Sequence, residues 1–281
     1  MPGRRLNKGA LRSRRYQVLG VILLFCAVVA GVWWISGRGA GQRDLAWQRL
    51  KAEGRLRVGL DPSYPPFEWA DEATGALNGY DIDLARELGV RLGAQIDFVE
   101  IGFDGLYDAV RTGKIDAIVS GMPYDPTMTE NVAYGVWYFN AGQFLVVQVG
   151  EGKIGSVDDL DGRKLGVELG STGDLEARRL ERKGRQFTLV TYPTAEDALN
   201  ALTRQQVDAV LVDAISAYVS MARGAAVKPA GPAVLDESYA VVTDRKSAQL
   251  RAAIDQIILQ MKGDGFLDQL RDKWLLKKDA P

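Results

Sequence analysis

The sequence reads LRVGLDPSYPPFEW from Leu56 to Trp69. Its first five residues are typical of a buried strand, and the prolines that follow remove helical and ladder hydrogen bonds from the next segment. Asp61 and Tyr64 therefore lie in a stiff loop just past the carboxyl end of a strand. Ligands bind at this end of the strands in open α/β sheets, so the loop is a candidate binding segment.

One order of elements occurs twice after residue 54: strand, helix, strand, helix, strand. This order predicts parallel strands with right-handed crossovers, and two copies predict two α/β lobes. Two extended apolar runs, 143–149 and 238–243, would cross between the lobes as a hinge. The expected strands are 56–60, 94–100 and 115–120 in the first copy and 164–169, 188–192 and 207–212 in the second.

The lobe boundaries follow from these crossings. Residues 55–142 together with 238–281 are expected to form the first lobe, and 143–237 the second. Two helices close the chain, and we expect them to return to the first lobe. The expected helices are one opening near Asp81, then 103–113, 174–183, 194–204, 214–223, 247–261 and 265–275.

The residues before the lobes have the pattern of a membrane segment. The uncharged run VLGVILLFCAVVAGVWWI is eighteen residues long, which approaches the length that spans a bilayer core. Basic residues precede it, so residues 1–17 are expected in the cytoplasm and the lobes outside it. Residues 18–36 are either a transmembrane anchor or a cleaved signal, and their length favours the anchor. Residues 37–54 are expected to be a linker and a short helix.

The composition argues against several classes of function. The 281 residues carry a net charge of −1, and the only dense basic run is at the extreme N-terminus, so no nucleic-acid partner is expected. There is no histidine, and the single cysteine, Cys26, lies inside the apolar run. We therefore expect no metal site, no cofactor and no disulfide. Hydrolytic chemistry is disfavoured, whereas carboxylate chemistry stays open.

Polar and aromatic side chains follow the expected strands in both lobes. Tyr64 and Phe103 offer aromatic faces that attract cations and apolar groups, although either could belong to the core. Asp213 could hold a cation or cap the next helix. Ser171 and Thr172 open a helix, where they could hold an anion or simply cap it. The other candidate ligand-binding residues are Asp61, Gly121 and Glu168.

Several stretches, taken in order, resemble the family 3 extracellular solute-binding proteins of ABC importers, the polar amino-acid class. The resemblance covers about 55–277 and implies an α/β, two-lobed periplasmic-binding-protein-like fold of type II. Two hinge strands would let the ligand close the lobes. The matching stretches are 56–61, 66–68, 79–84, 113–117, 166–173 and 207–210.

The resemblance also implies roles for the candidate residues. Asp213 would pair with the α-ammonium of the ligand, and Tyr64 and Phe103 would sandwich its side chain. The 171–172 segment would receive the α-carboxylate, and Asp61 would reach the ligand side chain.

One departure from the family pattern affects the ligand. After Gly121 the family has a hydroxyl residue and a carboxylate-clamping arginine, whereas this chain has Pro123 and Met128. Either the ligand is a cation without a carboxylate, or the 171–172 helix terminus holds the carboxylate alone. Glu168 would be a second acid, beside Asp213, facing the ligand between the two lobes.

The sequence therefore predicts a membrane-tethered, extracytoplasmic solute-binding protein that delivers a small polar, amine-bearing solute to an ABC permease. We expect a monomer that is not an enzyme, in the periplasm or at the cell surface, or secreted if the segment is cleaved. Two alternatives remain. A dehydratase-type enzyme on the same scaffold would need a cation for its substrate's carboxylate, which Met128 does not supply. An extracytoplasmic sensory domain would need a membrane partner to carry its signal.

Overall fold

The computed structural model describes residues 44–276. The predicted basic N-terminus at 1–17 and the predicted membrane segment at 18–36 lie outside the described residues. Among the helices of 44–276, none combines the length and the hydropathy that crossing a bilayer requires.

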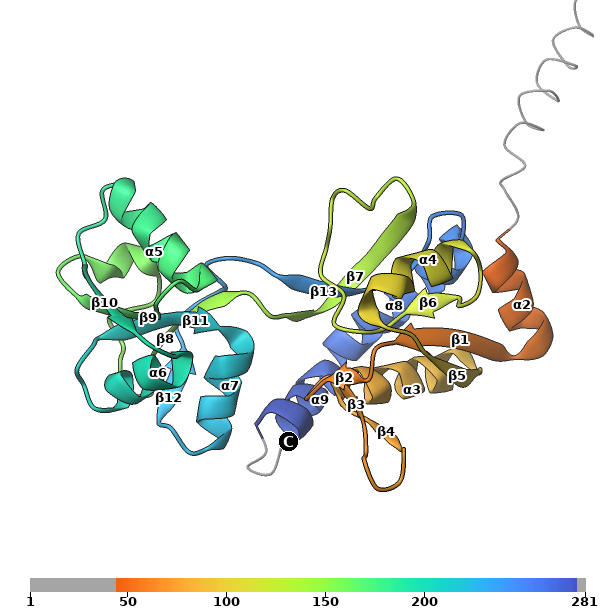
Figure 1. Cartoon of the computed structure of the whole chain (residues 1–281), viewed down its shortest axis with the longest axis horizontal. Coiled ribbons are helices and arrows are strands. Elements are labelled where there is room, and N and C mark those ends of the chain that lie inside the picture. The colour runs from red at the N-terminus through yellow and green to blue at the C-terminus, as the bar shows by residue number, and fades with distance from the viewer. Residues whose placement is uncertain (1–43, 277–281) are drawn as a thin grey trace, which may run out of the picture. The chain divides into compact units, whose positions relative to one another are not determined.

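The first sheet contains the strands of the first sequence repeat. Its order is β5-β1-β6-β13-β7 (Figure 1). β1 (Arg55–Leu60) pairs in parallel with β5 (Gln95–Glu100) and with β6 (Ala117–Ile118). β13 (Ser238–Asp244) pairs antiparallel with β6 and with β7 (Val132–Asn140). The sheet is therefore mixed and not wholly parallel, because the returning strand β13 enters between β6 and β7.

Helices pack on this sheet through their apolar faces. In α3 (Tyr80–Leu92), buried residues recur at the spacing of one helical face, and Gly93 ends the helix in the left-handed conformation at a φ of 66°. The terminal helices α8 (Ala248–Gly263) and α9 (Phe266–Leu275) share a core with α3. The remaining helices are α2 (Leu45–Glu53), η1 (Phe103–Gly105) and α4 (Leu106–Arg111).

The second sheet has the order β10-β9-β11-β8-β12. β9 (Lys164–Glu168) pairs in parallel with β10 (Thr188–Tyr192) and β11 (Ala209–Asp213). β8 (Gln143–Gln148) pairs antiparallel with β11 and with β12 (Val227–Pro229), so this sheet is also mixed. Its helices are η2 (Val157–Leu160), α5 (Thr172–Arg182), α6 (Ala195–Thr203) and α7 (Ala214–Ala222).

Two predictions of strands were incomplete. The expected strand 115–120 is reduced to the two residues of β6, and β7 was not predicted. The proline-rich loop also forms part of a small sheet of β2 (Ser63–Tyr64), β3 (Glu68–Ala70) and β4 (Leu77–Asn78). β3 and β4 pair antiparallel as a hairpin.

Two extended segments link the sheets, and they run side by side (Figure 1). The Ala141 N–H donates to the Glu237 carbonyl at 2.9 Å, and the Gln143 N–H donates to the Leu235 carbonyl at 2.9 Å. Gly142 lies between these bonds, and a Cβ there would stand 1.9 Å from the Leu235 carbonyl oxygen. The close approach of the two segments therefore requires glycine at this position.

Candidate functional site

A pocket of about 320 Å³ lies where the loops after β1 and β6 meet the beginning of β13. It brings together four of the residues predicted from the sequence: Asp61, Tyr64, Phe103 and Gly121. The other lining residues are Ser63, Glu68, Pro123, Glu237 and Tyr239. Because the strand-end loops supply most of this wall, the site is where the sheet topology predicts it.

Tyr64 is held by aromatic neighbours on two sides. Its ring stacks on Phe67 with centroids 5.2 Å apart, and its hydroxyl lies 3.0 Å from the hydroxyl of Tyr239. Tyr239 in turn packs edge-on against Phe67 at 5.5 Å. Burial raises the pKa of Tyr64, so its hydroxyl stays protonated and uncharged at neutral pH. The pocket therefore has a fixed, neutral aromatic wall.

Gly121 lies directly against the Tyr64 ring of this aromatic wall. Its φ is 47°, in the left-handed region that glycine adopts without strain, and an added Cβ would stand 3.0 Å from the Tyr64 ring. The glycine is therefore required by both the backbone conformation and the neighbouring ring.

Asp61 connects the loop after β1 to the loop that carries Phe103. Its Oδ2 accepts the Phe103 N–H at 2.7 Å, and its own N–H donates to Ser120 Oγ at 3.0 Å. The Phe103 side chain remains 42% exposed at the start of η1. Asp61 therefore positions an exposed aromatic ring and leaves one carboxylate oxygen for other contacts.

Two buried acids lie beneath the pocket. Glu68 is 1% exposed and Asp81 is fully buried. Ser120 Oγ donates to Glu68 Oε1 at 2.6 Å, while Asp81 Oδ2 accepts the Gly121 N–H at 2.5 Å and the Tyr138 hydroxyl at 3.0 Å. The remaining oxygens, Glu68 Oε2 and Asp81 Oδ1, have no other partner among the described residues.

The two acids interact with each other and share a proton. Burial, followed by the charge of Asp81, raises the pKa of Glu68 to about 11. Burial also raises the pKa of Asp81 to about 6, although hydrogen bonds, first that with Glu68, oppose this shift. At neutral pH Glu68 is therefore protonated beside an ionised Asp81, since two buried carboxylates in contact cannot both ionise at low cost.

The two positions that depart from the family pattern differ in their surroundings. Pro123 lines the pocket, where it provides neither a backbone N–H nor a hydroxyl group. Met128 is not among the lining residues and packs against the hydrophobic cluster around Leu106 and Val110. The pocket wall thus contains no replacement for a cationic clamp at these positions.

The predicted residues of the second lobe do not line this pocket. Asp213 is the N-cap of α7, where its carboxylate accepts the Ser216 N–H at 2.8 Å. Burial is the main cause of the raised pKa of Tyr64, and the negative charge of Asp213 is a much smaller one. Capping and an electrostatic role at the site are therefore compatible for Asp213.

The segment around Ser171 forms the N-terminus of α5. The Ser171 hydroxyl donates to the Glu168 carbonyl at 2.8 Å and accepts the Asp174 N–H at 3.1 Å. Asp174 Oδ2 accepts the Gly170 N–H at 3.0 Å. Ser171 thus has the capping role, and Thr172 and Glu168 lie on either side of it.

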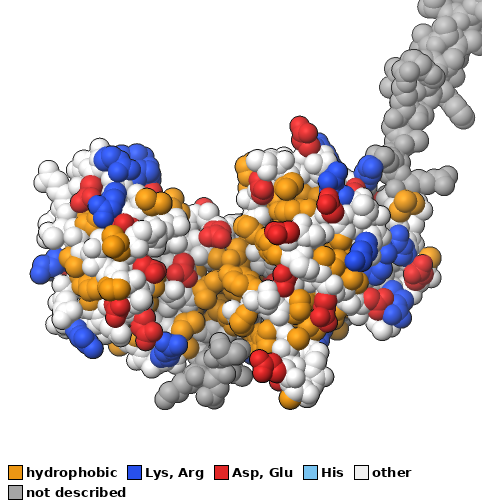
Figure 2. Space-filling model, viewed as in Figure 1, with side chains coloured by type: hydrophobic (Ala, Val, Ile, Leu, Met, Phe, Trp, Pro, Cys, Tyr) orange, Lys and Arg blue, Asp and Glu red, His pale blue; other side chains and the backbone are white. Residues whose placement is uncertain are grey.

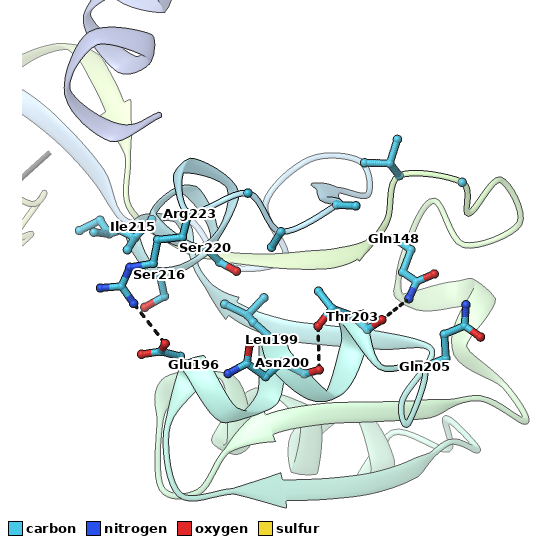
Figure 3. Close-up of a pocket in the computed structure, with 16 residues that line it drawn as sticks. Gln148, Glu196, Leu199, Asn200, Thr203, Gln205, Ile215, Ser216, Ser220 and Arg223 are labelled. Carbon is cyan, nitrogen blue, oxygen red and sulfur yellow. Dashed lines mark hydrogen bonds and ion pairs between the residues drawn. The ribbon is translucent and has the colours of Figure 1, made fainter. Parts of the chain in front are cut away.

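A larger cavity of about 750 Å³ lies between α6 and α7 (Figure 3). Arg223 and Glu196 point toward each other at its rim and pair at 3.2 Å, and Gln148 Nε2 donates to the Thr203 carbonyl at 3.3 Å. No aromatic ring and no predicted site residue lines it. We therefore assign the candidate site to the smaller pocket, where acids and rings converge.

Sequence reasoning missed Glu68, Ser63, Glu237 and Tyr239 as site residues. Tyr239 and Glu237 belong to the returning segment, so their distance along the chain from Tyr64 hides their proximity. Glu68 could have been suspected, because it follows the proline-rich loop directly. In residues 44–276, no group of three or more acidic, cysteine or histidine residues is arranged to hold a metal ion.

Comparison with known proteins agrees with this geometry. The family of bacterial extracellular solute-binding proteins, family 3, matches residues 56–277. The histidine-binding periplasmic protein of Salmonella typhimurium, strain LT2, is 31% identical over 228 residues, covering 78% of this chain and 87% of that protein. An ancestral cationic amino acid solute-binding protein of known structure is 30% identical, with a TM-score of 0.57, over 81% of this chain and 98% of that one.

The fold is supported by a more distant structure. The unliganded, open L-cystine solute receptor of Neisseria gonorrhoeae superposes with a TM-score of 0.70 at 23% identity, over 84% of this chain and 98% of that one. The chain therefore has the two-lobed α/β fold of periplasmic binding proteins. Its relatives of 30% identity or more are named as binding proteins, which supports the prediction that it binds a solute. The chain belongs to the bacterial extracellular solute-binding proteins of family 3.

Proposed function

We propose that this protein is the extracytoplasmic binding component of an ABC importer and that it takes up a small polar, amine-bearing solute. Residues 18–36 would tether it to the cytoplasmic membrane, and an ABC permease would receive the solute. The two lobes would be 55–142 with 238–281 and 143–237, and the protein would act as a monomer.

The pocket that Tyr64 and Asp61 line is the observation that carries this proposal. Its volume of about 320 Å³ suits a small molecule. Aromatic rings and carboxylates line it together, and both attract an ammonium group. Two relatives are named for histidine and for cationic amino acids, and such ligands carry an ammonium group.

The two linking segments support a hinge. They are short, extended and hydrogen-bonded to each other at Ala141 and Gln143. Rotation at these few residues would bring Asp213, Ser171, Thr172 and Glu168 of the second lobe over a solute bound at Tyr64. Asp213 would then supply a second carboxylate for the ammonium group.

Binding measurements on the full-length chain test this function. A panel of amino acids, amines and small peptides is screened by thermal shift, and hits are measured by calorimetry. We expect saturable binding with a stoichiometry of one, together with a decrease in the radius of gyration measured by X-ray scattering. A panel without a single hit would contradict the proposal, as would co-purification with a sensor kinase instead of a permease.

A further inference from the structure

The pocket of the first lobe offers few hydrogen-bond donors. The Gly121 N–H is used by Asp81 at 2.5 Å, and the Phe103 N–H is used by Asp61 at 2.7 Å. The Asp61 N–H is used by Ser120 at 3.0 Å, and Pro123 has none. An anionic group needs such donors when it leaves water, and here the backbone groups at the strand ends are already engaged.

Acceptors, by contrast, remain available. Asp61 uses one carboxylate oxygen for Phe103, and its Oδ1 makes no hydrogen bond within residues 44–276. The Glu237 carboxylate has no ion-pair partner in the same part of the chain, and Glu237 is exposed where the returning segment meets the pocket. The hydroxyls of Tyr64 and Tyr239 form a hydrogen bond with each other, so only one of their two hydroxyl hydrogens is left to donate to a ligand.

Charges of one sign surround the pocket. Its described lining residues include the acids Asp61 and Glu237 and the protonated acid Glu68, and no lysine or arginine. On the face shown in Figure 2, hydrophobic and acidic side chains dominate where the two sheets are linked, and basic side chains gather farther out, for example over α5. A bound carboxylate would therefore meet negative charge without a compensating cation.

The helix termini of the second lobe do not correct this imbalance. The N-terminus of α7 already holds the Asp213 carboxylate. In the first turn of α5, Asp174 is 3% exposed, pairs with Arg178 at 2.9 Å and accepts the Gly170 N–H at 3.0 Å. Each acid occupies the place where a helix would otherwise attract an anion. Closure of the second lobe would thus add acceptors to the site and little capacity for an anion.

We propose that the natural ligand is an organic cation without a carboxylate group beside its ammonium, namely an amine, a polyamine or a guanidine. Asp61, Glu237 and Asp213 would neutralise the cation, and Tyr64 and Tyr239 would pack against its carbon chain. This proposal rests on the proposed function, because it specifies the solute class of the same pocket.

Matched ligand pairs test the proposal, since the members of each pair differ only in the carboxylate. Arginine is compared with agmatine, lysine with cadaverine and histidine with histamine, by calorimetry on the full-length chain. We expect the decarboxylated member of at least one pair to bind about 100-fold more tightly, which corresponds to about 2.8 kcal/mol. Tighter or equal binding of the amino acid in the best pair overturns the proposal and leaves the proposed function intact.

Two substitutions sharpen the test. Glu237→Gln removes one carboxylate of the pocket, and the affinity for the best amine should fall at least about tenfold, or about 1.4 kcal/mol. Glu130→Gln is the matched control, because Glu130 is exposed and does not line the pocket, and it should leave affinity unchanged. Equal effects of the two substitutions would overturn the role of Glu237 and with it the proposal.

Pro123→Ser tests the missing donors directly. It restores a backbone N–H and a hydroxyl to the wall, so we expect the preference for the amine over its amino acid to shrink at least about tenfold. An unchanged preference overturns the donor argument. If no member of any pair binds, and no other solute of the screening panel does, the proposed function fails together with this inference.

Discussion

The hydroxyl oxygens of Tyr64 and Tyr239 lie 3.0 Å apart, although the residues are separated by 175 positions in the chain. Tyr64 belongs to the loop after β1, and Tyr239 belongs to β13, which returns from the second sheet. The aromatic wall of the pocket is therefore attached to one of the two linking segments. A movement of that segment would change the wall that holds the ligand.

Tyr239→Phe should weaken this attachment. Loss of one partly buried hydrogen bond is expected to lower the free energy of unfolding by about 0.5–1.5 kcal/mol, measured by urea denaturation. Ligand affinity should fall as well, because the Tyr64 ring loses its tether. Tyr107→Phe is the control, since the Tyr107 and Tyr134 hydroxyls form a similar pair at 2.6 Å away from the pocket. Equal affinities for both variants would contradict a role of the tether in binding.

Asp213→Asn should separate the capping role of Asp213 from its charge. Asparagine caps a helix about as well as aspartate, so the free energy of unfolding should change by less than about 0.5 kcal/mol. Removal of the charge should weaken binding of an amine at least about tenfold by calorimetry, or about 1.4 kcal/mol. Unchanged affinity would mean that Asp213 only caps α7.

Gly142→Ala should force the two linking segments apart. The new Cβ would stand 1.9 Å from the Leu235 carbonyl oxygen and 2.7 Å from the Glu237 nitrogen, and both of these are backbone atoms. Overpacking of this kind costs about 1–3 kcal/mol of stability. Gly150→Ala, where no atom lies within 4 Å of the new Cβ, is the control and should be close to neutral. A neutral Gly142→Ala would mean that the crossing tolerates separation.

Stability should fall as the pH rises, because of Glu68 and Asp81. Their pKa values lie above the ordinary values of 4.5 and 3.8, at about 11 and about 6, so the folded state holds protons that the unfolded state releases. Their contribution is complete below about pH 4 and is lost as the pH rises through the two raised pKa values.

Glu68→Gln replaces the protonated acid by a neutral amide and should flatten this dependence. Urea denaturation between pH 6 and pH 9 should show a slope less steep by up to about 1.4 kcal/mol per pH unit, the value for one whole proton. Glu130→Gln should keep the slope of the parent. Parallel slopes for the parent and Glu68→Gln would show that Glu68 is not protonated in the folded state.

Much of the fold could be predicted because its signals are local. The expected strands at 56–60, 188–192 and 143–149 agree with the structure to within one residue at each end, since buried strands are apolar runs bounded by turns. The predicted strand 115–120 is longer than β6, which has only two residues, and β7 was not predicted. β7 contains aromatic residues with mixed exposure, and it shows no simple alternation in the sequence.

The candidate site was only partly predictable. Asp61, Tyr64, Phe103 and Gly121 follow strands or open helices, which is a position that can be found in the sequence. A helix was expected to open near Asp81, and it does, but Asp81 itself is buried against Glu68. Only the folded chain shows this pairing, because it depends on the packing of β3, which carries Glu68, against the start of α3.

The sequence by itself determined the repeated order of strands and helices, the positions of the loops that follow the strands, and the absence of histidine from the site. These properties depend on residue type and on neighbours a few positions away. The tertiary structure alone decided that Tyr64 meets Tyr239, that Glu68 meets Asp81, and that the donors at Gly121 and Phe103 are already occupied. Such contacts arise when β13 returns and the strand-end loops close together, and no local pattern in the chain encodes which distant partner each group will find.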